Sequence, residues 1–166
     1  MLVLFKMYTC MKELLLDDFI TFRLLCLTNQ LSRQSTKLIA AHSNLRLPEW
    51  RCLAILGAHG PQQVSEITAR LQSDKGLVSR SLSGLVKKGC VETKCGSDDR
   101  RRTIVSLTTK GMSTVKRMMP IMQQRQTKLI DAVTKKERLM LYKVISKLQI
   151  ASTLADEEIA SKVPLR

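Results

Sequence analysis

Aromatic residues are scarce in this chain of 166 residues, because Phe, Tyr and Trp together make up only 4% of it. Proteins that bind single-stranded nucleic acid stack bases on aromatic rings, so this scarcity argues against that function. Acidic residues are also few, with 14 Asp and Glu against 28 Lys and Arg, which gives a formal charge of +14. Such a surplus predicts a polyanionic partner, either nucleic acid or an acidic membrane face, and double-stranded DNA is the leading candidate.

Long apolar runs are absent, and no stretch approaches the roughly 20 residues that a membrane helix needs, so we expect no membrane partner. The first five residues are apolar without a cationic lead-in, which is unlike a secretory signal. The five cysteines form no CxxC pair, which argues against a disulfide scaffold or a zinc finger and favours the reducing cytoplasm. His42 and His59 lack carboxylate clusters at metal spacing, and we expect neither a metal nor a cofactor.

Catalytic motifs are missing too. The chain contains no GxSxG, GxxxxGK or HExxH pattern and no paired carboxylates in an apolar setting. We therefore expect that the protein is not an enzyme.

Glycine and proline number only 7 and 4, so we expect short loops and a mainly helical chain. Apolar residues at helical spacing predict a long helix from about Leu16 to Ser43. Its apolar stripe consists of Leu24, Leu27, Leu31, Leu38 and Ala41. A second helix is predicted around Pro48, with Gly57 and the Gly60-Pro61 pair ending it.

Residues 64–88 predict two short helices joined by a tight corner. Val64, Ile67 and Leu71 share one face of the first, and Ser73 or Asp74 caps the second, which runs to Lys88 before Gly89. Cys90–Cys95 and Arg102–Leu107 then predict two strands, with a hairpin loop at 96–101.

Two long helices complete the predicted chain. Thr108 or Thr109 caps a helix to about Val133, and a capping box of Thr134 and Glu137 begins the last one. We expect an inward face on that last helix and fraying from Asp156 on. The expected inward residues are Leu141, Val144, Ile145 and Leu148.

The predicted helix from Lys75 to Lys88 is the candidate DNA-contacting element. Four apolar residues lie within about a third of its circumference and predict a buried face, namely Val78, Leu82, Leu85 and Val86. The other side carries small and cationic residues, namely Lys75, Gly76, Ser79, Arg80, Ser83 and Lys87. Such a surface can enter a major groove closely and hydrogen-bond base edges, although a merely solvated helix surface is the alternative interpretation.

Two neighbouring features favour the DNA-binding interpretation. The preceding short helix across a tight corner is typical of a helix-turn-helix. The following hairpin loop leads into Arg100, Arg101 and Arg102, and a narrow minor groove attracts such arginines. Between Ser73 and Arg117 there are eleven Lys or Arg against four Asp or Glu, a net +7. Together these features predict a winged helix-turn-helix.

At this point the sequence resembles the MarR-type transcriptional regulators, from about Leu47 to Leu148. The matching stretches are LPEWRCL (47–53), KGLVSR (75–80), KGCVE (88–92) and, most specifically, DRRRTIVSLTTKG (99–111). The resemblance implies a homodimer on palindromic DNA, with reading helices in successive major grooves and arginines in flanking minor grooves. It also implies an effector or oxidant that lowers the affinity.

By position, the resemblance implies that Ser79 and Arg80 read bases, that Arg101 enters the minor groove and that Asp99 orients Arg101. One departure is that family members often place Asp-Arg where this chain has Ser83-Gly84. Gly84 also costs a helix interior roughly 1 kcal/mol relative to Ala. The operator sequence therefore cannot be transferred from the family.

The expected fold class is mainly α with a small antiparallel β-hairpin wing (α+β). We expect an N-terminal dimerisation region at 1–47, a winged helix-turn-helix at 48–108, and C-terminal dimerisation helices with a tail at 109–166. The apolar stripes of the flanking helices exceed what one small core can cover, which predicts a homodimer.

A small-molecule effector, aromatic or other, is a further possible partner. Trp50 and four methionines, Met112, Met118, Met119 and Met122, could line its pocket, although such residues at helical spacing are usually plain core. Cys10, near Lys6 and Lys12, is the candidate for an oxidant-sensing thiol. Cys26 and Cys52 fall among apolar residues and are expected to be inert filler.

The sequence thus favours a dimeric, sequence-specific repressor of a palindromic operator, relieved by an effector. The alternative is a non-specific architectural or nucleoid-type DNA-binding protein, which would explain the charge without a dedicated reading face.

Overall fold

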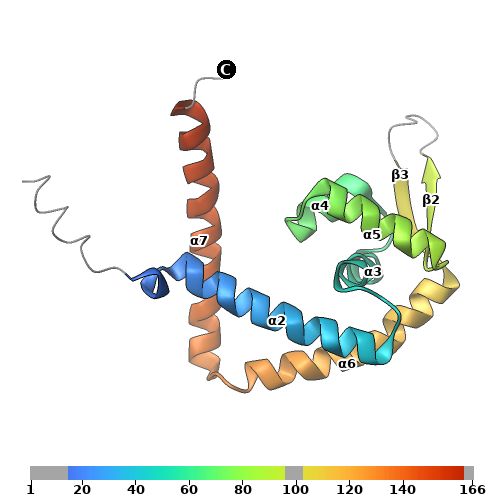
Figure 1. The fold of residues 1–166 in the computed structure, drawn as a ribbon, viewed down its shortest axis with the longest axis horizontal. Coiled ribbons are helices and arrows are strands. Elements are labelled where there is room, and N and C mark those ends of the chain that lie inside the picture. The colour runs from blue at the N-terminus through green and yellow to red at the C-terminus, as the bar shows by residue number, and fades with distance from the viewer. Residues whose placement is uncertain (1–14, 96–102, 163–166) are drawn as a thin grey trace, which may run out of the picture. The chain divides into compact units, whose positions relative to one another are not determined.

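The structure is a computed structural model that describes residues 15–95 and 103–162. It is mainly helical with a small antiparallel sheet (Figure 1), which confirms the predicted fold class. The chain divides into two compact units, Met1–Met118 and Met119–Arg166. Within the described ranges, no helix has both the length and the apolar character that crossing a membrane requires.

The first unit begins with the short 3-10 helix η1 (Leu16–Asp18) and the helix α2 (Ile20–His42). The predicted single helix is therefore interrupted at Phe19, whose backbone is extended. Ser35 and Ile39 are the buried residues of α2. Leu24 and Leu27 of the predicted stripe are 40% and 51% exposed, so one copy of the chain leaves much of that stripe uncovered.

Helix α3 (Leu47–His59) starts with Pro48 in its first turn, as predicted. The prediction that Gly57 ends this helix is wrong, because the helix continues to His59 and Gly60, at φ 74°, follows it. Gly57 has a packing role instead. A Cβ at this position would come within 2.8 Å of Val115 Cγ1 on the helix α6 (Thr109–Ile130).

The predicted pair of short helices is confirmed as α4 (Val64–Leu71) and α5 (Lys75–Lys87), which lie against each other (Figure 1). Gln72 turns the chain between them with a left-handed backbone, at φ 47° and ψ 47°. Of the two predicted caps for α5, Asp74 is the one used, since its Oδ1 accepts a hydrogen bond from Leu77 N at 2.9 Å. Gly89, at φ 67°, follows the helix as expected.

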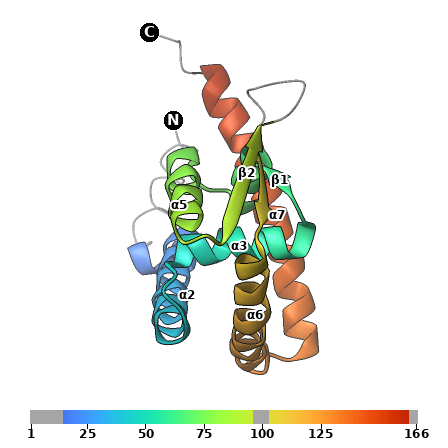
Figure 2. The same ribbon diagram turned by 90° about the vertical axis from the view of Figure 1, so that its right-hand side faces the viewer.

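Within the described residues, three strands form an antiparallel sheet of order β1–β3–β2. β2 (Val91–Cys95) pairs with β3 (Thr103–Leu107) in a register that places Val91 opposite Leu107, and Figure 2 shows β2 beside α5. β1 (Gln62–Gln63) pairs with the other edge of β3. The sequence did not indicate β1, because two glutamines carry no apolar alternation. The predicted loop at 96–101 lies outside the described residues.

The core of the first unit lies where α3 packs against α5 and β3, with α4 beside them. Leu53, Ile67, Leu85 and Val105 are each fully buried there. Burying each such side chain contributes about 1.5–3 kcal/mol, so this core fixes the position of α5.

Helix α6 begins after Thr108, whose Oγ1 accepts a hydrogen bond from Gly111 N at 3.1 Å and donates one to the carbonyl oxygen of Gly89 at 2.7 Å. Of the two predicted caps, Thr108 is therefore the one used. Gly111 packs so tightly on the chain before β2 that a Cβ would overlap the backbone carbonyl oxygen of Cys90. The helix crosses into the second unit and contains Pro120.

In the second unit, the predicted capping box is confirmed before α7 (Lys135–Lys162). Thr134 N donates to Glu137 Oε2 at 2.8 Å, and Glu137 N donates to Thr134 Oγ1 at 3.3 Å. The hydrogen bonds from Thr134 lower the pKa of Glu137. The expected fraying from Asp156 is wrong, because α7 continues to Lys162 and no proline or glycine occurs before Pro164.

The expected inward face of α7 is not buried in a single chain. Leu141, Val144 and Leu148 are 48%, 42% and 38% exposed, and Ile145 is half-buried. Much of this face is therefore uncovered in one copy of the chain.

Candidate nucleic-acid interface

Helix α5 has the two-sided character that its sequence predicted. Of the six α5 residues named for DNA contact, five are exposed and Gly76 is half-buried. We call these six residues, Lys75, Gly76, Ser79, Arg80, Ser83 and Lys87, the cationic face. On the other side Val78, Leu82 and Leu85 are buried, so the orientation of the helix is as predicted.

The prediction that Val86 lies on the buried side is wrong. Val86 is 44% exposed, whereas Ser81 is only 3% exposed. The buried sector is rotated toward Ser81, whose hydroxyl donates a hydrogen bond to the carbonyl oxygen of Leu77 at 2.7 Å. Because this bond satisfies the hydroxyl within the helix, a serine can be buried there at little cost.

Gly76 leaves the first turn of α5 without a side chain at this position. A Cβ at this position would lie 3.0 Å from Asp74 Oδ1 and 3.2 Å from Arg80 Nη1. The Arg80 guanidinium therefore lies across the space that a larger residue 76 would need. A surface without a side chain at this point can approach a partner closely.

An open groove lies beside the start of α5, between α4 and β3. Its volume is about 540 Å³, and its lining is Gln63, Val64, Ser65, Thr68, Ala69, Lys75 and Thr103. Most of these side chains are small or polar, and Lys75, which belongs to the cationic face, adds a positive charge to the groove.

A buried carboxylate lies on the other side of α5. Glu49 is 1% exposed and accepts hydrogen bonds from Lys88 Nζ at 2.6 Å, Arg46 N at 2.7 Å and Arg46 Nη2 at 3.2 Å. We call Arg46, Glu49 and Lys88 the charge cluster. This cluster was not predicted, although a glutamate three residues after a helix cap is the usual sign of a carboxylate that reaches back to the cap.

The charge cluster joins three parts of the first unit. Lys88 Nζ, just after α5, also donates to the carbonyl oxygen of Asn44 at 2.7 Å, in the segment between α2 and α3. Burial raises the pKa of Glu49, but the hydrogen bonds from Lys88 and Arg46 lower it by more, and the net pKa is lowered. Glu49 is therefore ionised at neutral pH and holds both cations in place.

The charge cluster also accounts for the glycine inside α5. A Cβ on Gly84 would lie 2.5 Å from Glu49 Oε1 and 3.2 Å from Arg46 Nη2. Position 84 thus has no room for a side chain while the cluster is formed.

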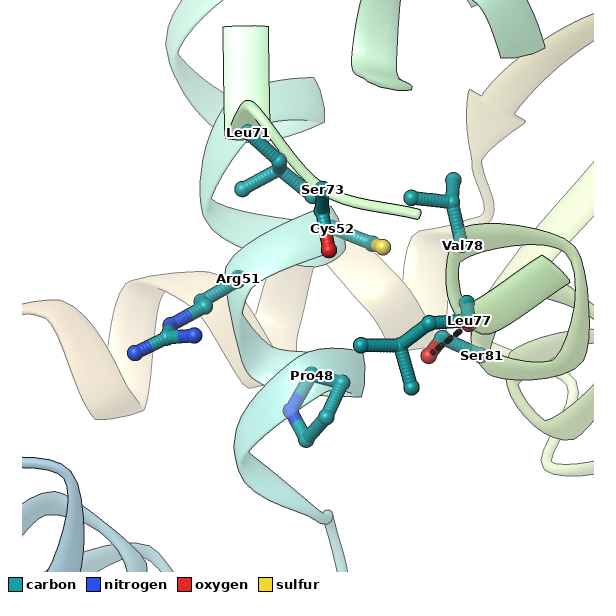
Figure 3. Close-up of a pocket in the computed structure, with 8 residues that line it drawn as sticks. All are labelled: Pro48, Arg51, Cys52, Leu71, Ser73, Leu77, Val78 and Ser81. Carbon is teal, nitrogen blue, oxygen red and sulfur yellow. Dashed lines mark hydrogen bonds between the residues drawn. The ribbon is translucent and has the colours of Figure 1, made fainter. Parts of the chain in front are cut away.

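A small pocket lies between α3 and α5 (Figure 3). Its lining includes Pro48, Cys52, Leu77 and Ser81, and its volume is about 20 Å³. This is room for about one water molecule, so the pocket cannot hold an organic effector as it stands.

The cysteines differ from one another in burial. Cys52 and Cys90 are buried, and Cys26 is exposed on α2. The expectation that Cys26 and Cys52 are buried packing residues is therefore confirmed for Cys52 and wrong for Cys26. Burial, and secondarily the negative charge of Glu49, raises the pKa of Cys52 to about 11. The candidate sensor Cys10 lies outside the described residues.

Three of the residues named for an effector pocket lie in the first unit, and two of them are buried in its core. Trp50 and Met118 are 5% and 0% exposed, and both belong to the core. Met112 is instead 41% exposed. Asp99, Arg100, Arg101 and Arg102, predicted for the wing, lie outside the described residues.

Residues 43–102, from the segment before α3 to the predicted wing, match the MarR family. The match covers these 60 residues of the 166. A curated relative, the HTH-type transcriptional regulator BilQ of Clostridium symbiosum, is 26% identical over 83 residues, which is 50% of this chain and 58% of BilQ. The chain thus matches little more than half the length of that relative.

Solved structures share the fold of this chain. A MarR/EmrR family transcriptional regulator from Acinetobacter sp. ADP1 superimposes with a TM-score of 0.79 at 23% identity, over 85% of this chain and 99% of the other. MepR of S. aureus, in a complex with DNA, superimposes with a TM-score of 0.74 at 18% identity, over 80% of this chain and 97% of MepR. These likenesses establish the winged-helix fold of the chain.

Proposed function

We propose that this chain is a sequence-specific transcriptional regulator of the MarR type that binds double-stranded DNA in the cytoplasm. The observation that carries the proposal is the exposure of the cationic face on a helix whose opposite side is core. MepR, which has a similar fold, forms a complex with DNA, which supports the same partner for this chain. The proposal gives the protein no catalytic role.

In this proposal α5 enters the major groove. Ser79 and Arg80 hydrogen-bond base edges, and Gly76 lets the helix approach closely. Lys75, Ser83 and Lys87 contact the flanking phosphates and sugars. In the wing, Asp99 orients Arg101 into the minor groove, and Arg100 and Arg102 add positive charge beside it.

The proposed active form is a homodimer, in which residues 48–108 read DNA and residues 1–47 and 109–166 supply the contacts between copies. Two exposed apolar sets support it. One, on η1 and α2, contains Leu16, Phe19, Ile20, Leu24, Leu25 and Leu27; the other, on α7, contains Leu139, Met140, Leu141, Tyr142, Val144 and Leu148. Apolar surface of this extent is rare on a monomer. A twofold axis would place the two α5 helices about one DNA turn, ~34 Å, apart on a palindrome.

We further propose that the dimer represses transcription and that a small molecule, aromatic or other, relieves the repression. The pocket between α3 and α5 has room for only about one water, so such a ligand would need a different site or a different conformation of the chain.

The experiment is fluorescence anisotropy with the duplex from the protein's own upstream region and with a scrambled duplex of equal length. We expect tighter binding to the first. Arg80→Ala should remove about 1–3 kcal/mol of that preference. Lys75→Ala is the matched control on the same helix and should weaken binding to both duplexes alike.

The high overall charge favours a second candidate, a non-specific architectural protein. In that case the wild type would bind both duplexes equally, and Arg80→Ala would weaken binding evenly across sequences. That result would overturn the specific regulator.

A further inference from the structure

One edge of α5 carries a positive charge that comes from a different segment of the chain. Arg46, immediately before α3, places its Nη2 atom 3.2 Å from the point where a Cβ on Gly84 would be, and its side chain is 70% exposed. We propose that Arg46 is an additional DNA-contacting residue that binds a backbone phosphate beside α5. This inference rests on the proposed function, because it takes α5 to be the helix that enters the groove.

The position of residue 84 on the helix determines what Arg46 lies next to. Residues three or four apart on a helix are neighbours, so position 84 adjoins both Arg80 and Lys87 of the cationic face. The Arg46 guanidinium therefore extends that face along the edge nearer to α3. Arg46 thus adds a cation from a separate segment of the chain at a position that neighbours Arg80 and Lys87 on the helix.

The charge cluster fixes Arg46 in this place before any ligand arrives. Glu49 Oε1 accepts a hydrogen bond from Arg46 Nη2, and Glu49 Oε2 accepts one from the backbone N–H of the same residue at 2.7 Å. A guanidinium has five N–H donors, and with 70% of the side chain exposed it retains donors for a second anion. Since the cluster contains two cations and one carboxylate, it keeps a net positive charge.

A phosphate is the ligand that this location favours over a base. A helix in the roughly 12 Å wide major groove directs its outermost residues at the base edges, whereas residues on its sides face the sugar-phosphate walls. Arg46 lies at the side of α5, beyond Arg80 and Lys87. Its contact should therefore add affinity without sequence preference.

The test is the salt dependence of duplex binding by the full chain, measured by fluorescence anisotropy on the upstream and scrambled duplexes. Arg46→Ala should weaken binding to both duplexes by the same factor, about five- to tenfold at 0.1 M salt, and reduce the slope of log K against log salt by about 1. Arg46→Lys, which keeps the charge, should retain most of the slope. Arg46→Met, which keeps the aliphatic stem without the charge, should behave like Arg46→Ala.

Arg51→Ala is the matched control. Arg51 is an exposed arginine in the helix α3 that follows Arg46, but its Nη2 donates to Ser32 Oγ of α2 at 3.4 Å and not to the charge cluster. This variant should leave the slope unchanged. An unchanged slope in both Arg46→Ala and Arg46→Met, or a loss confined to the upstream duplex, would overturn the inference. Failure of the wild type to prefer its own duplex would instead count against the proposed function.

Discussion

The carboxylate of Glu49 occupies the space where a side chain on Gly84 would begin, since a Cβ there would lie 2.5 Å from Oε1. Glu49 belongs to α3 and Gly84 to α5, and Lys88, just after α5, donates to the same carboxylate. The glycine that weakens the helix locally thus permits a buried ionic contact that joins two helices.

Gly84→Ala should lower stability, against the usual effect of this substitution. Alanine normally improves a helix interior by about 1 kcal/mol. Here the methyl group would push against a carboxylate held by three hydrogen bonds, and we expect a net loss of about 1–3 kcal/mol in urea unfolding. Ser83→Ala, at the exposed neighbouring position, should change stability by less than about 0.5 kcal/mol. A more stable Gly84→Ala protein would contradict this account.

Stability should fall in acid, partly through Glu49. The charge cluster lowers its folded-state pKa, so the unfolded chain binds a proton at a higher pH than the folded chain does. The stabilisation is therefore complete above the ordinary glutamate pKa of about 4.3 and is lost as pH falls through the lowered value. Unfolding by urea over a pH series measures this, with Glu49→Gln as the comparison. The advantage of the wild type over Glu49→Gln should shrink in acid, and an advantage independent of pH would exclude this role.

Gly111→Ala should disrupt the first unit. A Cβ at this position would overlap the backbone carbonyl oxygen of Cys90. The end of a side chain could rotate to relieve such an overlap, but a backbone oxygen cannot move without shifting the chain. We expect a loss of at least about 3 kcal/mol, measured by thermal and urea unfolding. Ser113→Ala, at an exposed position of the same helix, is the control and should be nearly neutral. Wild-type stability in Gly111→Ala would show that the contact between α6 and Cys90 is looser than described.

The described cysteines should differ in alkylation. Cys26 is exposed and should react with iodoacetamide in the native protein, whereas Cys52 should react only on unfolding, because it is buried and its pKa is raised to about 11. Peptide mapping by mass spectrometry reads each site separately. Rapid native labelling of Cys52 would mean that the contact between α3 and α5 opens readily.

Self-association should depend on the exposed apolar residues of α2. Leu25 is 55% exposed, and Leu25→Glu should shift the protein from dimer toward monomer in sedimentation equilibrium. Gln34→Glu introduces the same charge at an exposed polar position of α2 and should leave the dimer intact. A wild-type chain that sediments as a monomer at all accessible concentrations would refute the proposed dimer.

Local patterns were enough to predict most of the elements and the orientation of α5. Asp74 caps α5, Thr134 and Glu137 cap α7, and Gly89 follows α5, because each of these depends on residues within a few positions of one another. The cationic face was predictable for the same reason, since a helical period assigns its two sides.

The tertiary structure decided what depends on residues far apart in the chain. Glu49 meets Lys88 across 39 positions, Gly57 makes room for Val115, and β1 exists only because β3 lies beside it. No local pattern indicates such contacts, because they arise when separate helices pack on a shared core and polar groups that lose water must find partners there. The sequence by itself determined which side of α5 is cationic, and the packing of α3 on α5 decided that Arg46 lies at its edge.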